Sequence, residues 1–180
     1  MALARSFESL ETAKQRLVAE LETWGNARLR FQPNLKSWST LDVVDHLVKV
    51  EDAFLQEVDE ALPGSRKVNL RERFGALAVI CVMRSPLRIQ TPPSAAQVLP
   101  QGLTTWAETR ENWGKVRERL RLLLDQIRPE RHQLALFRHP VSGWMTIRRG
   151  LGFLDAHLRH HQYQLERLKR ATSRLGSQPG

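Results

Sequence analysis

Apolar side chains recur at three- and four-residue steps in four long segments of the chain, which is the spacing that gathers them on one face of an α-helix. The first segment shows this pattern with Phe7, Leu10, Leu17, Leu21 and Trp24. We predict helices over residues 6–27, 40–62, 106–127 and 147–170. No segment alternates between apolar and polar residues over a useful length, so we expect no β-strand. The pattern therefore predicts an all-α protein.

The starts of two of these helices carry capping signals. Ser39 precedes the second helix and is followed three residues later by Asp42, which gives a weak capping box. Thr105 and Glu108 stand in the same register before the third helix. The Pro63-Gly64 pair ends the second helix, since proline cannot continue a helix and glycine favours its termination.

About 40 residues separate the second and third long helices, which is long for a connection between neighbouring helices. Residues 69–83 predict a further short helix, and the loop after it contains Pro86, Pro92, Pro93 and Pro100. We therefore predict a four-helix bundle with a long crossover connection that contains an extra short helix. The bundle forms one domain over residues 1–180, with a disordered tail over residues 171–180.

Composition narrows the class of protein. The 180 residues are 41% hydrophobic and 26% charged, which suits one globular domain. The longest apolar stretch, residues 76–83, is far shorter than the roughly 20 residues of a membrane span. Charged residues near the N-terminus leave no room for an export signal, so we expect a cytoplasmic protein without a membrane partner. The single cysteine, Cys81, excludes an internal disulfide, and we expect it in the core.

The net charge of +9 is unevenly distributed along the chain. Residues 1–90 carry 13 Lys or Arg against 12 Asp or Glu, whereas residues 91–180 carry 15 against 7. Such an excess fits an anionic partner, either a nucleic acid or a small acidic substrate, and equally fits a solvated face. The sequence has no helix-turn-helix signature, zinc finger or aromatic stacking motif, so we expect no nucleic-acid partner.

The last helix carries three histidines, His157, His160 and His161. At about 100° per residue, His161 lies about 40° around the helix from His157, inside the apolar stripe, while His160 falls on the shoulder toward solvent. A pair of histidines at positions i and i+4 directs two imidazoles toward one point. The spacing therefore favours His157 and His161 as a pair of metal ligands.

A third ligand is available from the second helix, where His46 lies among inward-facing apolar residues. Three neutral imidazoles around a divalent ion leave a coordination position open, which is typical of catalytic metal sites. Taken singly, each histidine is more often an ordinary core or surface residue. The sequence lacks the His-Glu-x-x-His motif of zinc proteases, and no carboxylate accompanies the pair as in oxygenase sites.

These motifs resemble those of the DinB-like superfamily of metalloproteins, which includes the YfiT-type proteins. The matching residues are Trp38-Ser39, His46 within Val-Val-Asp-His-Leu, the stretch from His139-Pro140 to Gly143, and His157-x-x-x-His161-x-x-Gln164. The resemblance covers roughly residues 5–170. It implies a four-helix bundle, often a homodimer, that holds a divalent metal, Zn²⁺ or Ni²⁺, on His46, His157 and His161.

The resemblance also implies a range of functions. Characterised members include transferases and isomerases that use low-molecular-weight thiols such as bacillithiol or mycothiol. We therefore expect a metal-dependent enzyme that activates a water or such a thiol toward a small-molecule substrate, as an S-transferase or a hydrolase. Gln164 and Asp42 are candidates for holding the ligand rings in place. The alternatives are a non-catalytic metal-binding or ligand-binding stress-response bundle and a basic nucleic-acid-associated protein.

Overall fold

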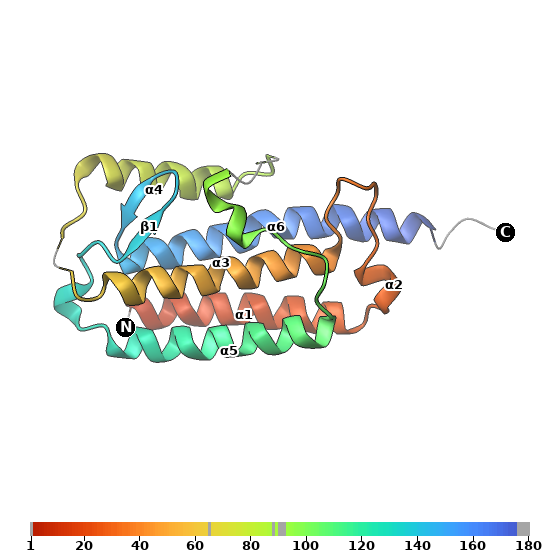
Figure 1. Ribbon diagram of the computed structural model, residues 1–180, viewed down its shortest axis with the longest axis horizontal. Coiled ribbons are helices and arrows are strands. Elements are labelled where there is room, and N and C mark those ends of the chain that lie inside the picture. The colour runs from red at the N-terminus through yellow and green to blue at the C-terminus, as the bar shows by residue number, and fades with distance from the viewer. Residues whose placement is uncertain (1, 65, 88, 90–92, 176–180) are drawn as a thin grey trace.

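Four long helices form the body of the molecule: α1 (Ala2–Glu22), α3 (Thr40–Ala61), α5 (Trp106–Gln126) and α6 (Ile147–Leu175) (Figure 1). The computed structural model describes residues 2–64, 66–87, 89 and 93–175. Within these ranges the shorter elements are α2 (Asn26–Leu29), α4 (Leu70–Met83), two 3₁₀ helices, η1 (Pro93–Val98) and η2 (Pro129–Arg131), and two strands, β1 (Phe137–His139) and β2 (Gly143–Met145).

The four long helices enclose one apolar core. α3 packs on α5 and α6. α1 also packs on α5 and α6, on the side away from α3. Fully buried leucines join the helices at the centre: Leu10, Leu21, Leu47, Leu120 and Leu158. α3 and α5 run in the same direction (Figure 1), so the chain between them must travel back along the bundle. α4 and η1 lie in that return path, which confirms the predicted crossover with an extra helix.

The helix starts agree with the predicted caps. The Ser39 hydroxyl accepts from the Asp42 backbone N–H, and the Asp42 carboxylate accepts from the Ser39 backbone N–H. Thr105 and Glu108 form the same reciprocal pair before α5. Asn69 opens α4 in this way as well. Each box satisfies backbone donors that the helix itself leaves free, so local chemistry fixes these boundaries.

Three predicted boundaries are wrong. The first helix begins at Ala2 instead of residue 6. The first predicted helix breaks after Glu22, and α2 restarts with Gly25 as an extended N-cap residue. At the other end, α6 continues to Leu175. Residues 171–175 are therefore helical where a disordered tail was expected, whereas residues 176–180 lie outside the described part of the chain. The apolar spacing marks the helices but does not fix where the last turn stops.

A short antiparallel hairpin precedes α6, although we expected no strand. Phe137 pairs with Met145 and His139 with Gly143, and Gly143 adopts a positive φ of 78°. Glycine reaches this backbone region without the penalty that a Cβ brings. Strands of three residues are too short to show an alternating pattern, which explains why the sequence did not reveal them. The hairpin packs against α4 and α3.

α4 covers α6 with only part of its surface. Ala76 and Ile80 are its buried residues, while Phe74 on the opposite face is 70% exposed. Cys81 lies on the exposed side as well, so the prediction of a core cysteine is wrong. α4 is apolar from Phe74 to Met83 and has room for only one face against the bundle. No helix among the described residues is long and apolar enough to cross a membrane.

Candidate metal centre

Three histidines meet between α3 and α6. His46 extends from α3, and His157 and His161 extend from one face of α6. The Nε2 atom of His157 lies 3.3 Å from Nε2 of His46 and 3.2 Å from Nε2 of His161. Two nitrogens bound to one tetrahedral Zn²⁺ stand about 3.4 Å apart, because each Zn–N bond is about 2.1 Å long. The spacing of the three nitrogens therefore suits a single small cation.

The outer ring nitrogens of two of these histidines are occupied. Nδ1–H of His46 donates to the backbone carbonyl of Val98 at 2.8 Å. Nδ1–H of His161 donates to the side-chain oxygen of Gln164 at 3.0 Å. A carbonyl oxygen accepts only, so each of these bonds fixes the proton on Nδ1 and leaves a lone pair on Nε2. Both lone pairs then point toward Nε2 of His157.

Neutral imidazoles alone do not satisfy this arrangement. Nε2 of His157 has two neighbouring lone pairs, on His46 and His161, and a neutral ring has at most one proton there to donate. Whether or not His157 carries that proton, at least one buried acceptor nitrogen then receives no hydrogen bond while its lone pair faces another ring nitrogen at close range. A cation at the centre would relieve this repulsion, because all three nitrogens would then direct lone pairs at a positive charge. The donor set therefore fits a divalent metal.

The cluster is well shielded from water. His46, His157 and His161 are 3%, 7% and 6% exposed. Burial is the largest influence on each ring, and it lowers the pKa of His46, lowers that of His157 well below its ordinary value, and lowers that of His161 to about 3. The rings are therefore neutral at neutral pH, which is the form that binds a metal.

Two aromatic side chains pack against the ligand rings. The half-buried Trp38 ring lies 4.9 Å from the His46 ring centre and stacks on His161 at 6.2 Å. On the other side, Phe153 stacks on His157 at 5.5 Å. Such contacts restrict ring rotation and keep the surroundings apolar. The Trp38-Ser39 pair therefore serves twice, since Ser39 caps α3 and Trp38 packs against the histidines that α3 and α6 present.

The sequence of this chain also matches a known protein family. Residues 9–165 match the family model of the DinB superfamily. The chain belongs to the DinB superfamily. It is also similar to the uncharacterized protein YuaE of Bacillus subtilis (strain 168), with 24% identity over 168 residues that cover 87% of this chain and 96% of the relative. The predicted family membership and helical fold are both confirmed.

In this DinB superfamily protein, Gln164 and Asp42 were predicted to hold the ligand rings in place, and only Gln164 forms a hydrogen bond to one of them. Gln164 holds the His161 ring through Nδ1. Asp42 instead accepts from Ser39 and from the Gln32 amide. It therefore does not orient His46 by hydrogen bonding, contrary to the prediction. The residue that holds His46 is Val98, and no side-chain pattern could indicate it, because the contact uses a backbone carbonyl.

Two further histidines, His160 and His139, lie near the cluster, and His160 differs from expectation. His160 was expected toward solvent, yet it is 9% exposed, because α4 packs on α6 and the backbone of Ser85, just after α4, contacts its ring. Its ring centre lies 5.2 Å from that of His161. His139, at the end of β1, accepts backbone N–H groups of Val141 and Ser142 through Nδ1 and so braces the hairpin turn. Burial lowers the pKa of His139 to about 4.

These shifts predict that the metal-free protein loses stability in mild acid. The pKa values of His139 and His161 are about 4 and about 3 in the folded protein, below the ordinary 6.5 that they regain on unfolding. Below pH 6.5 the unfolded chain therefore binds protons that the folded chain refuses. Each histidine then lowers the free energy of unfolding by roughly 1.4 kcal/mol per pH unit.

The measurement is urea unfolding of chelator-treated protein between about pH 7 and about pH 5. The His139→Gln variant should show a shallower dependence on pH, because glutamine does not titrate. A free energy of unfolding that stays level over this range would contradict the prediction.

Proposed function

We propose that this protein is a metal-dependent enzyme that activates a small nucleophile, a low-molecular-weight thiol first and a water second, for attack on a small-molecule substrate. The observation that carries the proposal is the set of Nε2 atoms on His46, His157 and His161, which lie 3.2 and 3.3 Å apart along the cluster. Membership of the DinB superfamily supports the same reading.

The chain's own residues would hold and shield the metal. His46, His157 and His161 would supply three neutral nitrogen ligands, and the Val98 carbonyl and Gln164 would keep two of those rings aimed inward. A divalent cation, Zn²⁺ or Ni²⁺, supplies a Lewis acid that lowers the pKa of a water or thiol. Three protein ligands leave room for that molecule, as in catalytic zinc sites.

Burial of the cluster favours a small nucleophile. All three rings are almost fully covered, and Trp38 and Phe153 pack against them. A bulky or macromolecular group would not fit at such a centre, whereas a water or the end of a thiol is small enough to bind there. The apolar surroundings also favour sulfur, which is less strongly hydrated than an oxygen nucleophile. These features support an S-transferase ahead of a hydrolase.

Cobalt substitution tests this proposal directly. Protein purified without a histidine tag is stripped with chelator and loaded with Co²⁺, which takes the place of Zn²⁺ and is coloured. Adding bacillithiol, mycothiol, glutathione or cysteine one at a time should produce a sulfur-to-cobalt charge-transfer band for the preferred thiol. That thiol should then react with a generic electrophile in proportion to metal occupancy.

The same experiment separates the alternatives. Stoichiometric metal with neither thiol binding nor hydrolysis of model esters and amides would overturn the enzymatic proposal and leave a metal-binding bundle. Protein that binds no metal would overturn both. A nucleic-acid role has less support, because arginines that gave the C-terminal half its basic excess are paired with carboxylates in this structure: Arg117, Arg119, Arg121 and Arg159.

A homodimer belongs to the same proposal as an expectation from the family. Its physical support is the exposed apolar face of α4, which includes Phe74, Leu77 and Val82. The run from Phe74 to Met83 has no charged side chain, so a second copy could cover this face without burying an unpaired charge.

A cytoplasmic location remains part of the proposal and rests on the sequence.

A further inference from the structure

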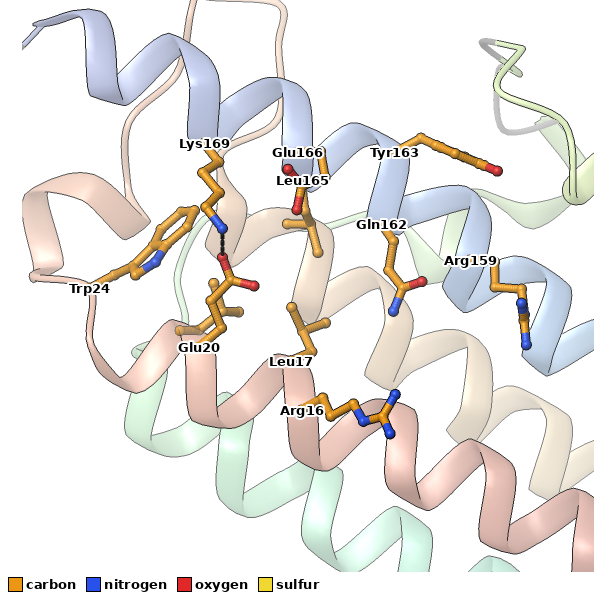
Figure 2. Close-up of a pocket in the computed structure, with 11 residues that line it drawn as sticks. Arg16, Leu17, Glu20, Trp24, Arg159, Gln162, Tyr163, Leu165, Glu166 and Lys169 are labelled. Atoms are coloured by element: carbon orange, nitrogen blue, oxygen red, sulfur yellow. Dashed lines mark hydrogen bonds and ion pairs between the residues drawn. The ribbon is translucent and has the colours of Figure 1, made fainter.

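A groove lies between α1 and α6 (Figure 2). Its volume is about 360 Å³, which falls within the roughly 300–1,000 Å³ of small-ligand pockets. The groove is separate from the histidine cluster. His161 and Gln162 are successive residues, so their side chains leave α6 about 100° apart, and Gln162 faces the groove while His161 faces α3.

The base of the groove is apolar. Leu17 and Leu21 of α1, Trp24 just after α1, and Leu165 of α6 line it, and all four belong to the buried core. Along α6 the lining extends over ten residues, from Arg159 to Lys169, roughly 15 Å at the helical rise. An elongated apolar body of about that length would lie along the seam between α1 and α6, over the outer edges of these largely buried side chains.

The polar side chains around this base are arranged by charge. Arg16 and Arg159 stand at one end, while Glu166 and an ion pair between Glu20 and Lys169 line the other (Figure 2). Arg16 makes no hydrogen bond or ion pair within the described chain, and Arg159 uses only Nε to reach Asp155. Guanidinium donors therefore remain available at the first end, and a guanidinium can bind a carboxylate through two parallel hydrogen bonds.

We propose that this groove binds a small amphipathic anion, a carboxylate with an apolar body such as a medium-chain fatty acid. The carboxylate would lie against Arg16, with Arg159 contributing to the field, and the apolar body would lie along Leu17, Leu21 and Leu165. A cationic amphiphile of the same length is disfavoured, because its head would face two guanidinium groups. This site is independent of the metal centre and of the chemistry proposed there.

The test compares decanoate with decylamine, each titrated below its micelle concentration into the full-length protein by calorimetry. Decanoate should bind saturably with one site, and decylamine should bind much more weakly. The Arg16→Glu variant should weaken decanoate binding by about tenfold or more, because it removes a charge-assisted hydrogen bond and adds repulsion. The matched control is Arg5→Glu, the same change on an exposed residue of α1 outside the groove, which should stay within about twofold.

A second variant tests the groove without changing charge. Gln162→Trp places a large side chain in the space and should weaken decanoate binding while the metal content stays the same as in wild type. Thermal unfolding of each variant checks that the bundle is intact. The proposal is overturned if decylamine binds as tightly as decanoate, if Arg16→Glu matches Arg5→Glu, if Gln162→Trp binds decanoate like wild type, or if decanoate shows no saturable binding.

Discussion

The His157→Ala variant should contain no stoichiometric metal when wild-type protein purified in the same way contains one ion per chain. His157 is the middle ligand, since its Nε2 lies within 3.3 Å of Nε2 of both His46 and His161. Loss of a residue that only supports a ligand already costs roughly 10–100-fold in metal affinity. Loss of the middle ligand itself should therefore cost more than about 100-fold.

The measurement is elemental analysis of untagged protein, followed by calorimetric titration of the apoprotein with Zn²⁺. Thermal unfolding adds an independent readout. A metal at about 100 times its Kd stabilises the folded state by about 2.7 kcal/mol, so wild type should gain stability with Zn²⁺ and the variant should not.

Two further variants should have no effect and an intermediate effect on metal binding. His132→Ala removes a histidine that contacts the Ile127 carbonyl away from the cluster, so its metal content should match wild type. Gln164→Ala removes the acceptor that fixes the His161 ring and should weaken Zn²⁺ binding by roughly 10–100-fold. Retention of a full metal complement by His157→Ala would show that the three histidines are not the metal site.

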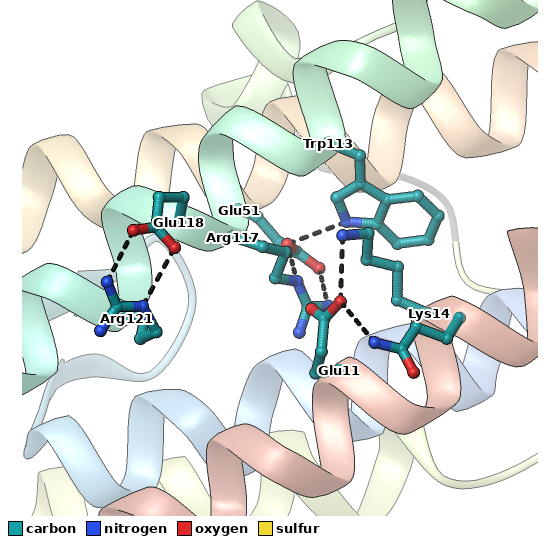
Figure 3. Close-up of polar contacts among 8 residues, drawn as sticks. Glu11, Lys14, Glu51, Trp113, Arg117, Glu118 and Arg121 are labelled. Carbon is teal, nitrogen blue, oxygen red and sulfur yellow. Dashed lines mark hydrogen bonds and ion pairs between the residues drawn. The ribbon is translucent and has the colours of Figure 1, made fainter.

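The second large effect concerns stability, and it arises at a buried ion pair between α3 and α5 (Figure 3). The guanidinium of Arg117 donates two hydrogen bonds to the carboxylate of Glu51, at 2.7 and 2.6 Å. The indole N–H of Trp113 donates to the same carboxylate at 3.0 Å. Glu51 and Arg117 are only 3% and 2% exposed, so water does not replace either partner.

Glu51→Ala should lower the free energy of unfolding by about 3–5 kcal/mol, because it leaves a buried guanidinium without a counter-charge. Nη1 of Arg117 already has no hydrogen-bond partner among the described residues, so the guanidinium depends on Glu51 for its ion pair. Urea unfolding monitored by circular dichroism measures the change, provided that the transition remains two-state.

An exposed pair on the same two helices provides the control. Arg119 and Asp52 lie 2.6 Å apart, with side chains that are 51% and 34% exposed. Asp52→Ala should therefore cost less than about 1 kcal/mol. The double variant Glu51→Leu/Arg117→Met should recover much of the loss, because it removes both buried charges together. A Glu51→Ala protein as stable as Asp52→Ala would show that the buried pair does not hold α3 against α5.

The elements that the sequence predicted well are those governed by neighbours along the chain. Ser39, Asp42, Thr105 and Glu108 mark helix starts because capping boxes form within three residues. The pairing of His157 and His161 on one face of α6 follows from helical geometry alone. The third histidine was a weaker inference, since its position depended on two helices packing side by side.

The elements that the sequence missed depend on contacts between distant segments. Val98 reaches His46 only because the crossover returns over α3 and α6. His160 is buried for a related reason, since α4 packs on α6 and the backbone of Ser85 contacts its ring. Helical spacing assigned His160 to the solvent side, because the pattern contains no information about a fifth helix laid on the bundle.

The sequence by itself determined the helices, their caps, the crossover and the face of α6 that carries two histidines, because each of these follows from chain-local hydrogen bonding and periodicity. Tertiary structure alone decided that the Nε2 atoms of His46, His157 and His161 converge, that Val98 fixes one ring, and that Glu51 meets Arg117. Those contacts join residues from 50 to more than 100 positions apart, where only the packing of helices sets which side chains meet.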